Sequence, residues 1–580
     1  MRNGWGKSFL AVVGLCGGGA ALAQETPPPP PPVQADLPTR GEIEGTLPED
    51  RAPQPPRVRV DTSGALAHAP CALDGSDVRV NLTGLTLERP DGTPLPPELQ
   101  QLLAGADAGL LGEQPIAVVC SVRDRINERL SEAGYVALAQ IPAQQISDGV
   151  LRMQVVTARI TEVRIVGDPG PFRALLEERV EQIRTLDPLN RRDAERILLL
   201  TGDTPGLDVR LSLSSANAAP GEVIGTLTVE TRRFALLANV QDYGSPQLGR
   251  WIGSLRGEAY GLTGMADRSY LAYSNSFDWK EVRVLQAGHD FQLAGSGLRA
   301  GFYGSLAWSR PDIEDLDLRS RSQIAGFNLT LPLRRTVQQT VSATAGFEFL
   351  DQKADIHATS GTLPFTQDKL RVAYARIDYD LGFISGNSEL ARASGSLEVR
   401  KGLDVFGASE KGVIAGRAAP SRLAGEATAF VAKGDLNVAV KPHRLFQLDL
   451  SGFVQWTDDP LLNLEEFSVG NYTRGRGYDP GSNGGDRAYG FTVEPRVKLP
   501  IARFGVQVSG FYDWVRLENL DPGTNEPKAT LRSIGAGLRF ILPQRLVVDL
   551  TYAHPLDKVL STDAKKPSDR LLLSLTAKLY

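Results

Sequence analysis

The chain has 580 residues, of which 42% are hydrophobic and 23% are charged, and its formal net charge is −5. This length favours more than one domain, and the slight acidic excess does not suit a nucleic-acid-binding protein, which carries a basic patch. The mean hydropathy is −0.17, and beyond the N-terminus no apolar run approaches the ~20 residues of a transmembrane helix. The chain is therefore either soluble or crosses a membrane as strands.

Residues 1–23 have the features of a secretory signal peptide. Arg2 and Lys7 precede an apolar, glycine-rich stretch, and Ala21-Leu22-Ala23 fits a cleavage site. We expect Cys16 to be removed with this peptide. The mature protein then lies in an oxidising compartment outside the cytoplasm.

Two cysteines remain, Cys71 and Cys120. In an oxidising compartment an isolated pair favours a disulfide, and two buried free thiols are the alternative. A zinc site is not expected, because the chain has only five histidines and no C-x-x-C spacing.

Residues 24–70 are rich in proline, which indicates an extended, semi-rigid linker. A short helix near Ala35–Gly45 is conceivable, but Pro38 and Gly41 argue against it.

Two α+β domains are expected next, at residues 71–158 and 159–232, each in the order strand, helix, helix, strand, strand. In the first domain the predicted elements lie near residues 78–82, 97–106, 121–133, 135–136 and 151–155. In the second they lie near residues 160–165, 171–183, 189–200, 209–213 and 224–229. Each domain is at the small end of what folds alone.

Such domains can capture an extended segment of another chain on a strand edge or in a helix groove. Our choice for that surface is helix 189–200 with strand 209–213, through Leu189, Ile197, Leu200, Val209 and Leu211. The alternative is that both domains are spacers.

From residue 233 to residue 580 the helical periodicity disappears and an alternation of period two replaces it. In residues 445–456 the apolar set is Phe446, Leu448, Leu450, Val454 and Trp456, and the polar set is Gln447, Asp449, Ser451 and Gln455. About sixteen such segments occur, roughly one every 22 residues, which suits a membrane strand of about ten residues plus its connection.

The segments are predicted at residues 233–241, 250–261, 268–276, 281–292, 296–309, 320–332, 337–350, 369–382, 390–400, 423–435, 444–456, 488–500, 503–516, 530–542, 545–554 and 570–580. Short connections such as 501–502 alternate with long ones such as 351–368 and 401–422. The pattern predicts a 16-stranded antiparallel transmembrane β-barrel, preceded by two periplasmic α+β domains. A soluble sandwich or solenoid of antiparallel strands is the alternative.

The connection at residues 457–487 is long, polar and rich in glycine, and loops of this length are usually functional or disordered. It carries charged residues that can enter a water-filled barrel: Arg474, Arg476, Asp479, Asp486 and Arg487. A surface loop whose charges are solvated is the alternative.

The alternation places Asp513 and Glu494 on the inner face of the barrel wall. A buried arginine needs a carboxylate with matching fork geometry, so we expect Arg476 to pair with Asp513. Gly477 allows close approach to the wall, and Tyr478 is expected to pack there.

Three stretches of the chain together resemble a known family. The first is Gly134-Tyr135-Val136 with Ile141-Pro142-Ala143-Gln144 and Asp148-Gly149; the second is Leu199-Leu200 with Pro205-Gly206-Leu207 and Pro220-Gly221; the third is Arg476-Gly477-Tyr478 with Gly485-Asp486-Arg487. They are similar to the ends of two POTRA domains and to the loop-six signature of two-partner secretion outer-membrane transporters, the haemolysin secretion/activation protein family. The resemblance covers residues 71–580.

This resemblance implies a pore in the outer membrane of a Gram-negative bacterium that recognises a partner exoprotein, through its N-terminal secretion domain, and translocates it. It also implies the Arg476–Asp513 pair, contact with outer-membrane lipid and insertion by the barrel-assembly machinery. Alternatives are a barrel-assembly factor of the same superfamily and a diffusion porin. No catalytic constellation, cofactor site or metal site is expected from the sequence.

Overall fold

The structure is a computed structural model that describes residues 37–45, 60–66, 70–146, 148–216, 219–293, 295–313, 316–385, 388–413, 416–470, 474–501, 504–543 and 545–579. The predicted signal peptide and Cys16 lie outside the described residues, as does most of the predicted linker. No helix in these ranges is long and apolar enough to cross a membrane.

The first α+β unit has a sheet of order β3-β6-β5 among the described residues, with α3 packed on it. Its elements are β2 (Arg79–Leu82), β3 (Gly84–Glu88), α2 (Pro97–Leu102), β4 (Gly112–Pro115), α3 (Val118–Glu132), β5 (Ala137–Gln140) and β6 (Val150–Thr157). The buried residues of α3 are Val119, Cys120, Val122, Ile126 and Leu130, a helical stripe. They meet the inward residues of β6, Leu151, Met153 and Val155, which alternate with a period of two.

The second unit has a sheet of order β1-β8-β9-β7 within the described ranges. Its elements are β1 (Val60–Gly64), β7 (Arg159–Val166), the 3₁₀ turn η2 (Gly170–Phe172), α4 (Arg173–Arg184), α5 (Arg191–Gly202), β8 (Leu207–Ser215) and β9 (Glu222–Thr231). Strand β1 differs from the sequence-based expectation, because residues 60–64 were expected to be linker. This segment instead adds to the sheet in parallel with β8, from Val60↔Leu211 onward.

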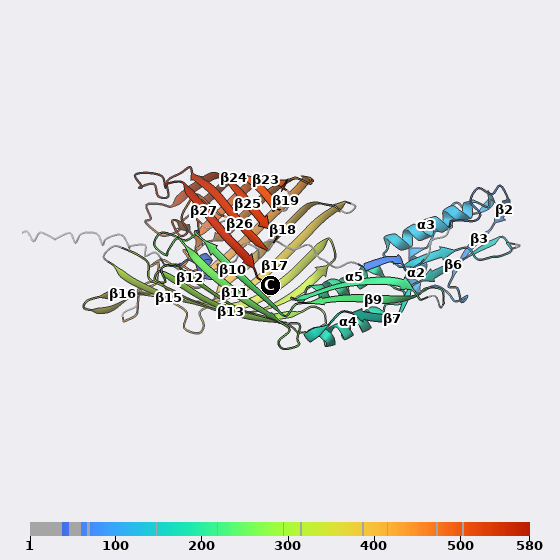
Figure 1. Cartoon of the computed structure of the whole chain (residues 1–580), viewed down its shortest axis with the longest axis horizontal. Helices are drawn as coiled ribbons and strands as arrows, with labels where there is room; N and C mark the ends of the chain where they lie inside the picture. The colour runs from blue at the N-terminus through green and yellow to red at the C-terminus, as the bar shows by residue number, and fades with distance from the viewer. Residues whose placement is uncertain are drawn as a thin grey trace, which may run out of the picture. The chain divides into compact units, whose positions relative to one another are not determined.

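The described residues of the C-terminal part form a closed antiparallel barrel of sixteen strands (Figure 1). They are β10 (Phe234–Gln241), β11 (Ile252–Tyr260), β12 (Arg268–Ser276), β13 (Val282–Gln292), β14 (Arg299–Ser309), β15 (Asp317–Arg335), β16 (Gln339–Ala358), β17 (Gly361–Ser385), β18 (Ser388–Gly402), β19 (Phe430–His443), β20 (Phe446–Thr457), β23 (Arg487–Ile501), β24 (Phe504–Glu518), β25 (Lys528–Leu542), β26 (Leu546–Pro555) and β27 (Arg570–Lys578). Pairing of β10 with β27 closes the ring.

The predicted fold class, two α+β units before a 16-stranded barrel, is confirmed. Two strand predictions need correction. The tenth strand is Phe430–His443, not 423–435, and the predicted long connection 351–368 belongs largely to the hairpin of β16 and β17. In this extension of β16, polar residues occupy the face on which Phe347 and Phe349 lie, so the apolar set that marks a lipid-facing strand ends there: Asp351, Lys353, Asp355 and His357.

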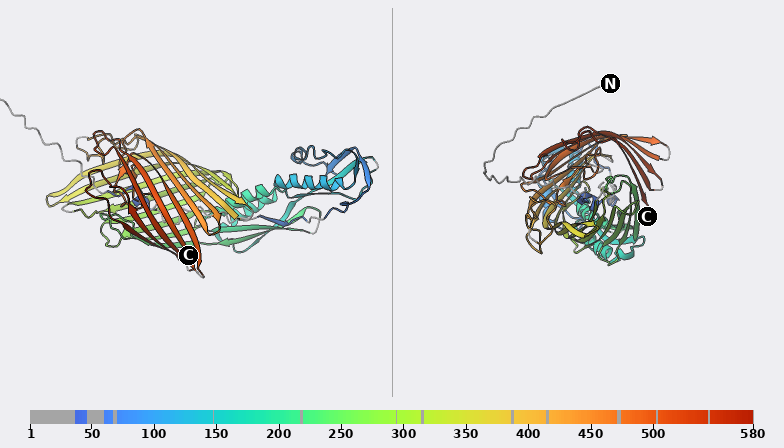
Figure 2. Two further views of the ribbon diagram at one scale, coloured as in Figure 1. Left: turned by 90° about the horizontal axis from the view of Figure 1, so that it is seen from above. Right: turned by 90° about the vertical axis from the view of Figure 1, so that its left-hand side faces the viewer.

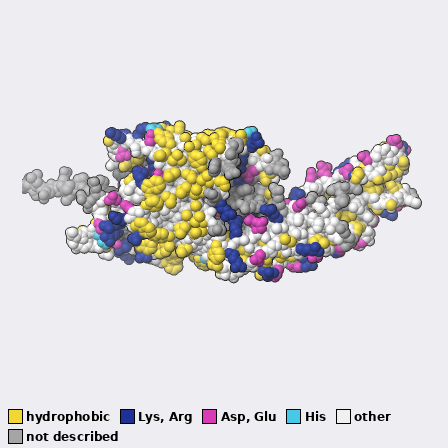
Figure 3. All heavy atoms as spheres, in the orientation of Figure 1, with side chains coloured by type: hydrophobic (Ala, Val, Ile, Leu, Met, Phe, Trp, Pro, Cys, Tyr) yellow, Lys and Arg dark blue, Asp and Glu magenta, His cyan; other side chains and the backbone are white. Residues whose placement is uncertain are grey.

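Large apolar side chains are exposed on the outer face of the barrel, among them Leu255, Leu271, Phe302, Leu397, Leu538 and Leu571. Figure 3 shows hydrophobic side chains as a band across the barrel, with Lys, Arg, Asp and Glu gathered toward its ends. A lipid-facing apolar band with a polar interior is the pattern of a membrane-spanning barrel.

A short helix, α1 (Arg40–Glu44), lies inside the ring of strands (Figure 2). This corrects the expectation that Pro38 and Gly41 prevent a helix here. Thr39 and Glu42 form a capping box, with Glu42 Oε2 accepting from Thr39 N at 2.9 Å and Thr39 Oγ1 accepting from Glu42 N at 3.3 Å. The cap satisfies the first amides, and burial of Ile43 supplies packing that local propensity lacks.

Candidate functional site

The connection between β20 and β23 folds back into the barrel. It carries a two-stranded piece, β21 (Phe467–Ser468) with β22 (Gly484–Gly485). Its buried apolar residues include Leu461, Leu462, Leu464, Phe467, Val469 and Tyr478. Several of them cluster with inward-facing residues of β17 and β24, such as Leu370 and Val515. We call residues 458–486 the lumen loop.

Arg476 of the lumen loop pairs with two carboxylates of the wall. Its Nε and Nη2 donate to Asp513 Oδ2 and Oδ1 at 3.1 and 2.8 Å, and its Nη1 donates to Glu494 Oε2 at 2.7 Å. The guanidinium carbon also lies 3.5 Å from the centroid of the Phe511 ring. Arg476 is 7% exposed and Asp513 1%, so this is a buried, bidentate ion pair of the strong kind.

Asp513 is held in place by further donors. It accepts from Thr492 Oγ1 at 2.9 Å, from Ser533 Oγ at 3.2 Å and from the backbone N of Arg476 at 3.1 Å. The carboxylate is therefore oriented by β23 and β25 toward the loop. The structure thus brings together Arg476, Asp513 and Glu494, as the alternation and the resemblance led us to expect.

Gly477 and Tyr478 complete this contact. A Cβ on Gly477 would lie 2.7 Å from Ser533 Cβ and 3.1 Å from the backbone of Pro555, so a side chain there would push the loop off the wall. Tyr478 is fully buried, and its hydroxyl donates to the carbonyl of Arg532 at 2.8 Å. Arg570 of β27 donates to the Tyr478 carbonyl.

Asp486 is fully buried at the other end of the lumen loop. It accepts from Arg422 Nη2 at 3.1 Å and from the backbone N of Leu461 and of Leu520, both at 2.7 Å. Arg422 lies in the connection between β18 and β19 and was not among the residues predicted from the sequence. No sequence pattern around Arg422 indicates its role, because that role depends on a contact with Asp486, 64 residues away.

The other two arginines predicted in the loop, Arg474 and Arg487, lie away from the contact of Arg476 with the wall. Arg474 pairs with Asp435 of β19 and stacks 4.6 Å from the centroid of the Phe453 ring. Arg487 begins β23, where its side chain is 28% exposed and its Nη2 donates to Asp458 at 2.8 Å. Arg476, Gly477 and Tyr478 therefore form one contact with the wall, whereas Arg474, Asp486 and Arg487 each have other partners.

Helix α1 is anchored by one cationic side chain. Arg40 Nη2 donates to Glu348 Oε1 at 2.9 Å, and Arg40 Nη1 donates to Glu465 Oε1 at 3.2 Å. Glu348 belongs to β16 and Glu465 to the lumen loop, and Arg400 of β18 contacts both carboxylates. This cluster joins the helix, the loop and the wall. Beside it remains a cavity of about 430 Å³ lined by α1, the lumen loop and the wall.

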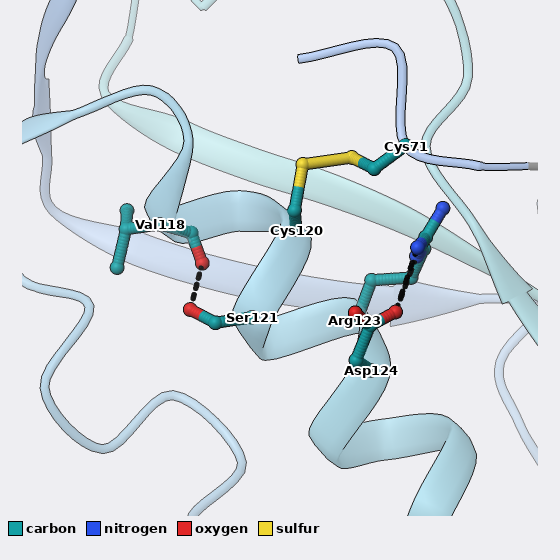
Figure 4. Close-up of a disulfide and its surroundings, with 6 residues drawn as sticks. All are labelled: Cys71, Val118, Cys120, Ser121, Arg123 and Asp124. Carbon is teal, nitrogen blue, oxygen red and sulfur yellow. Dashed lines mark hydrogen bonds and ion pairs between the residues drawn. A yellow bond between two sulfur atoms is a disulfide. The ribbon is translucent and has the colours of Figure 1, made fainter. Parts of the chain in front are cut away.

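Cys71 and Cys120 form a disulfide, which ties the segment before β2 to the first turn of α3 (Figure 4). In the same turn Ser121 Oγ donates to the carbonyl of Val118 at 2.7 Å. The bridge closes a loop with a sequence separation of 49 residues, and cross-links of this kind stabilise small domains chiefly by restricting the unfolded chain.

The prediction of a partner-binding surface on the second unit is wrong. Leu189, Val209 and Leu211 are buried in its core, Ile197 is packed against that core, and Leu200 is buried beside Gly297. Strand β8 is also not an edge, because β1 pairs with one side and β9 with the other. The periodic apolar residues of α5 form the face that packs in the core of the unit, and not an exposed face that could bind a partner.

A groove that is more suitable for binding an extended segment of a partner lies on the first unit, between α3 and β5. It has a volume of about 630 Å³, and apolar residues line it, among them Val119, Leu138, Ile141, Pro142 and Ile146. Within the described residues β5 pairs only with β6, so its outer edge borders the groove. Among the described residues no group of three or more His, Cys, Asp or Glu side chains could hold a metal ion.

Comparison with known proteins agrees with this architecture. The sequence model of the haemolysin secretion/activation protein family ShlB/FhaC/HecB matches residues 224–540. The solved structure of CdiB from Escherichia coli has a TM-score of 0.68 at 16% identity, covering 89% of this chain and 93% of that one. The solved structure of CdiB from Acinetobacter baumannii has a TM-score of 0.61 at 14% identity, covering 87% of this chain and 91% of that one. None of the curated proteins compared matches the chain in sequence.

Proposed function

The chain belongs to the haemolysin secretion/activation protein family ShlB/FhaC/HecB and is an outer-membrane transporter of two-partner secretion; from this premise we propose that α1 and the lumen loop close its pore at rest. The family exports a secreted partner exoprotein and is not an enzyme family. Family membership favours this role over a barrel-assembly factor or a diffusion porin.

The observation that carries the proposal is the shared anchoring of α1 and the lumen loop in one barrel. Arg476 holds the loop to Asp513 and Glu494 of the wall, and Arg40 holds α1 to Glu348 of the wall and Glu465 of the loop. A polypeptide crossing the barrel has to share the lumen with these two elements. Helix α1 has only five residues, so few contacts have to break for it to leave.

Helix α1 is the movable part of this closure, and the lumen loop is the fixed part. The loop is held by the buried pairs of Arg476 and Arg422, by Tyr478 and by several apolar residues. Breaking a buried ion pair costs roughly 3–5 kcal/mol. Release of α1 gives the exoprotein its path, while the seated loop keeps the wall in its secretion-competent form.

The two α+β units receive the exoprotein in the periplasm. The apolar groove between α3 and β5 supports this role, because an extended segment can lie in such a groove and add to the adjacent strand edge. The domain limits that fit this role are 1–23 for the signal peptide, 71–158 and 159–232 for the periplasmic units and 233–580 for the barrel. The predicted linker, 24–70, also contributes α1 to the barrel and β1 to the sheet of the second unit. The driving force is the free energy that the exoprotein gains by folding outside.

Two further partners follow from the barrel. Outer-membrane lipid contacts the apolar band of its outer face, which includes Leu255 and Phe302. The cell's barrel-assembly machinery inserts the chain, because strand edges left unpaired before the barrel closes would expose backbone N–H and C=O groups to lipid.

The secretion role is tested by comparing the proteins in the medium of cells with and without this chain. If the role is correct, we expect one large exoprotein, or very few, to disappear from the medium and accumulate or be degraded in the periplasm. An unchanged medium with a general loss of other outer-membrane barrels favours the assembly-factor role instead. An unchanged medium with reduced uptake of small solutes favours the porin.

A further inference from the structure

The wall beside α1 contacts the backbone of the chain it holds. Gln286 of β13 donates from Nε2 to the carbonyl of Ile43 at 2.9 Å, and Gln352 of β16 donates from Nε2 to the carbonyl of Pro38 at 3.1 Å. Every polypeptide carries such carbonyls. These two glutamines therefore recognise a chain without selecting its side chains.

The same wall carries an apolar row where a barrel interior is normally polar. Ile324, Leu350 and Leu370 are directly paired neighbours on β15, β16 and β17, and all three are buried. They cluster with Ile43 of α1, which is fully buried, and with Leu462 and Leu464 of the lumen loop. When α1 leaves, this cluster loses the apolar side chain of Ile43, and another apolar side chain can take its place.

A site for a basic side chain adjoins the row. Glu348 and Glu465 are both buried, and each pairs with two guanidinium groups, those of Arg40 and Arg400. When Arg40 leaves, each of these carboxylates loses one of its cations, which favours a replacement cation at this place.

We propose that the residues that hold α1 are a transit site for the exoprotein, and that α1 is a built-in competitor for it. We call them the α1 cradle: Gln286, Ile324, Glu348, Gln352, Leu350 and Leu370. The ligand is an unfolded segment with a basic residue close to a branched aliphatic one, as in Arg40 and Ile43. Three helical residues rise ~4.5 Å, a length that an extended chain covers in one to two residues.

This inference rests on the proposed function, because it needs an exoprotein that passes through the lumen. It adds that the passing chain contacts β13, β15, β16 and β17 in preference to the rest of the wall. The site would hold the chain weakly through backbone, apolar and charge contacts, so that arrival of the exoprotein and release of α1 are coupled by competition.

The direct experiment is photocrosslinking in cells that secrete the exoprotein. A folded domain is fused to the C-terminus of the exoprotein, so that the exoprotein stalls inside the transporter. Benzoylphenylalanine replaces Leu350 in the cradle or Arg539 of β25, a wall residue that pairs with Asp549 away from α1. We expect the exoprotein adduct at position 350 to exceed that at position 539 at least tenfold. Equal adducts, or an excess at 539, overturn the cradle while leaving the secretion role intact. No exoprotein adduct at either position, with no dependence of secretion on the chain, overturns the proposed function itself.

A second measurement separates the transit role from simple docking of α1. Leu350→Ser is placed in a variant that lacks residues 37–45, with Leu318→Ser as the matched control, since Leu318 is also a fully buried leucine but lies outside the cradle, on the neighbouring strand β15. The proposal expects Leu350→Ser to slow secretion at least threefold in that background and Leu318→Ser to leave it unchanged. If Leu350 serves only to dock α1, the substitution has no effect once α1 is absent, and the proposal fails.

Discussion

Arg40 of α1 and Arg400 of β18 share the same two carboxylates. Both guanidinium groups donate to Glu348 and Glu465, Arg40 at 2.9 and 3.2 Å and Arg400 at 2.5 and 2.6 Å. Glu348 lies on the wall and Glu465 on the lumen loop. Movement of α1 out of the barrel therefore breaks the pairs of Arg40 and leaves those of Arg400, so the wall and the loop stay joined.

Replacement of Arg40 by alanine should open the pore. The variant loses charged hydrogen bonds, each worth roughly 1.5–3 kcal/mol, and every 1.4 kcal/mol changes a population about tenfold. We expect open-channel conductance in planar bilayers to become at least tenfold more frequent than in the wild type. The control is Arg539→Ala, which removes a wall pair with Asp549 that does not contact α1. Equal conductance in the two variants would show that Arg40 does not hold the closure.

Replacement of Arg476 by alanine should stop secretion without unfolding the barrel. Asp513 would keep its bonds from Thr492 and Ser533 but lose its buried cation, at a cost of roughly 3–5 kcal/mol. Arg476→Lys should recover little, because an ammonium cannot reproduce the fork that meets both Asp513 oxygens and Glu494. Exoprotein in the medium is measured beside the heat-modifiability of the barrel. Normal secretion by a folded Arg476→Ala variant contradicts the role of the loop.

Gly477→Ala tests the close approach of the loop to the wall. The added methyl group would lie 2.7 Å from Ser533 Cβ, so we expect the loop to unseat and secretion to fall at least tenfold. Gly510→Ala is the matched control, because its Cβ would have no neighbour nearer than 3.9 Å, on the same wall. A Gly477→Ala variant that secretes as well as Gly510→Ala would mean that the loop tolerates a shift at this point.

Arg422→Ala should loosen the lumen loop on the outer side of the cell. It leaves the fully buried Asp486 with backbone donors only, and we expect protease added to intact cells to cut the loop at least tenfold faster. The control is Arg417→Ala in the same connection, whose pair with Glu410 is exposed and therefore worth roughly 0–1 kcal/mol. Equal protection of both variants would contradict a structural role for the Arg422–Asp486 pair.

The barrel and the Arg476 cluster could be predicted from the sequence because a strand has a fixed side-chain period. Once β23 and β24 are placed, Glu494 and Asp513 must face inward. Other features have no local pattern. Arg422 meets Asp486 only through two folded loops. Helix α1 gains from burial of Ile43 what Gly41 takes from its propensity, and Pro38 lies outside the helix, before the N-cap Thr39. The partner-binding prediction failed for a related reason, since periodic apolar residues such as Val209 mark the core of a domain.

The central claim, that α1 has to leave the barrel for secretion, is tested most directly by tethering it there. Ile43→Cys and Gln286→Cys put one thiol on each of two residues in contact, since the Gln286 amide donates to the backbone carbonyl of Ile43 at 2.9 Å, and a short reducible crosslinker can join them. We expect cells with the tethered transporter to retain the exoprotein, and mild reduction of the crosslink to restore its secretion. Normal secretion through a fully crosslinked transporter would contradict the account, because the exoprotein would then pass with α1 still in place.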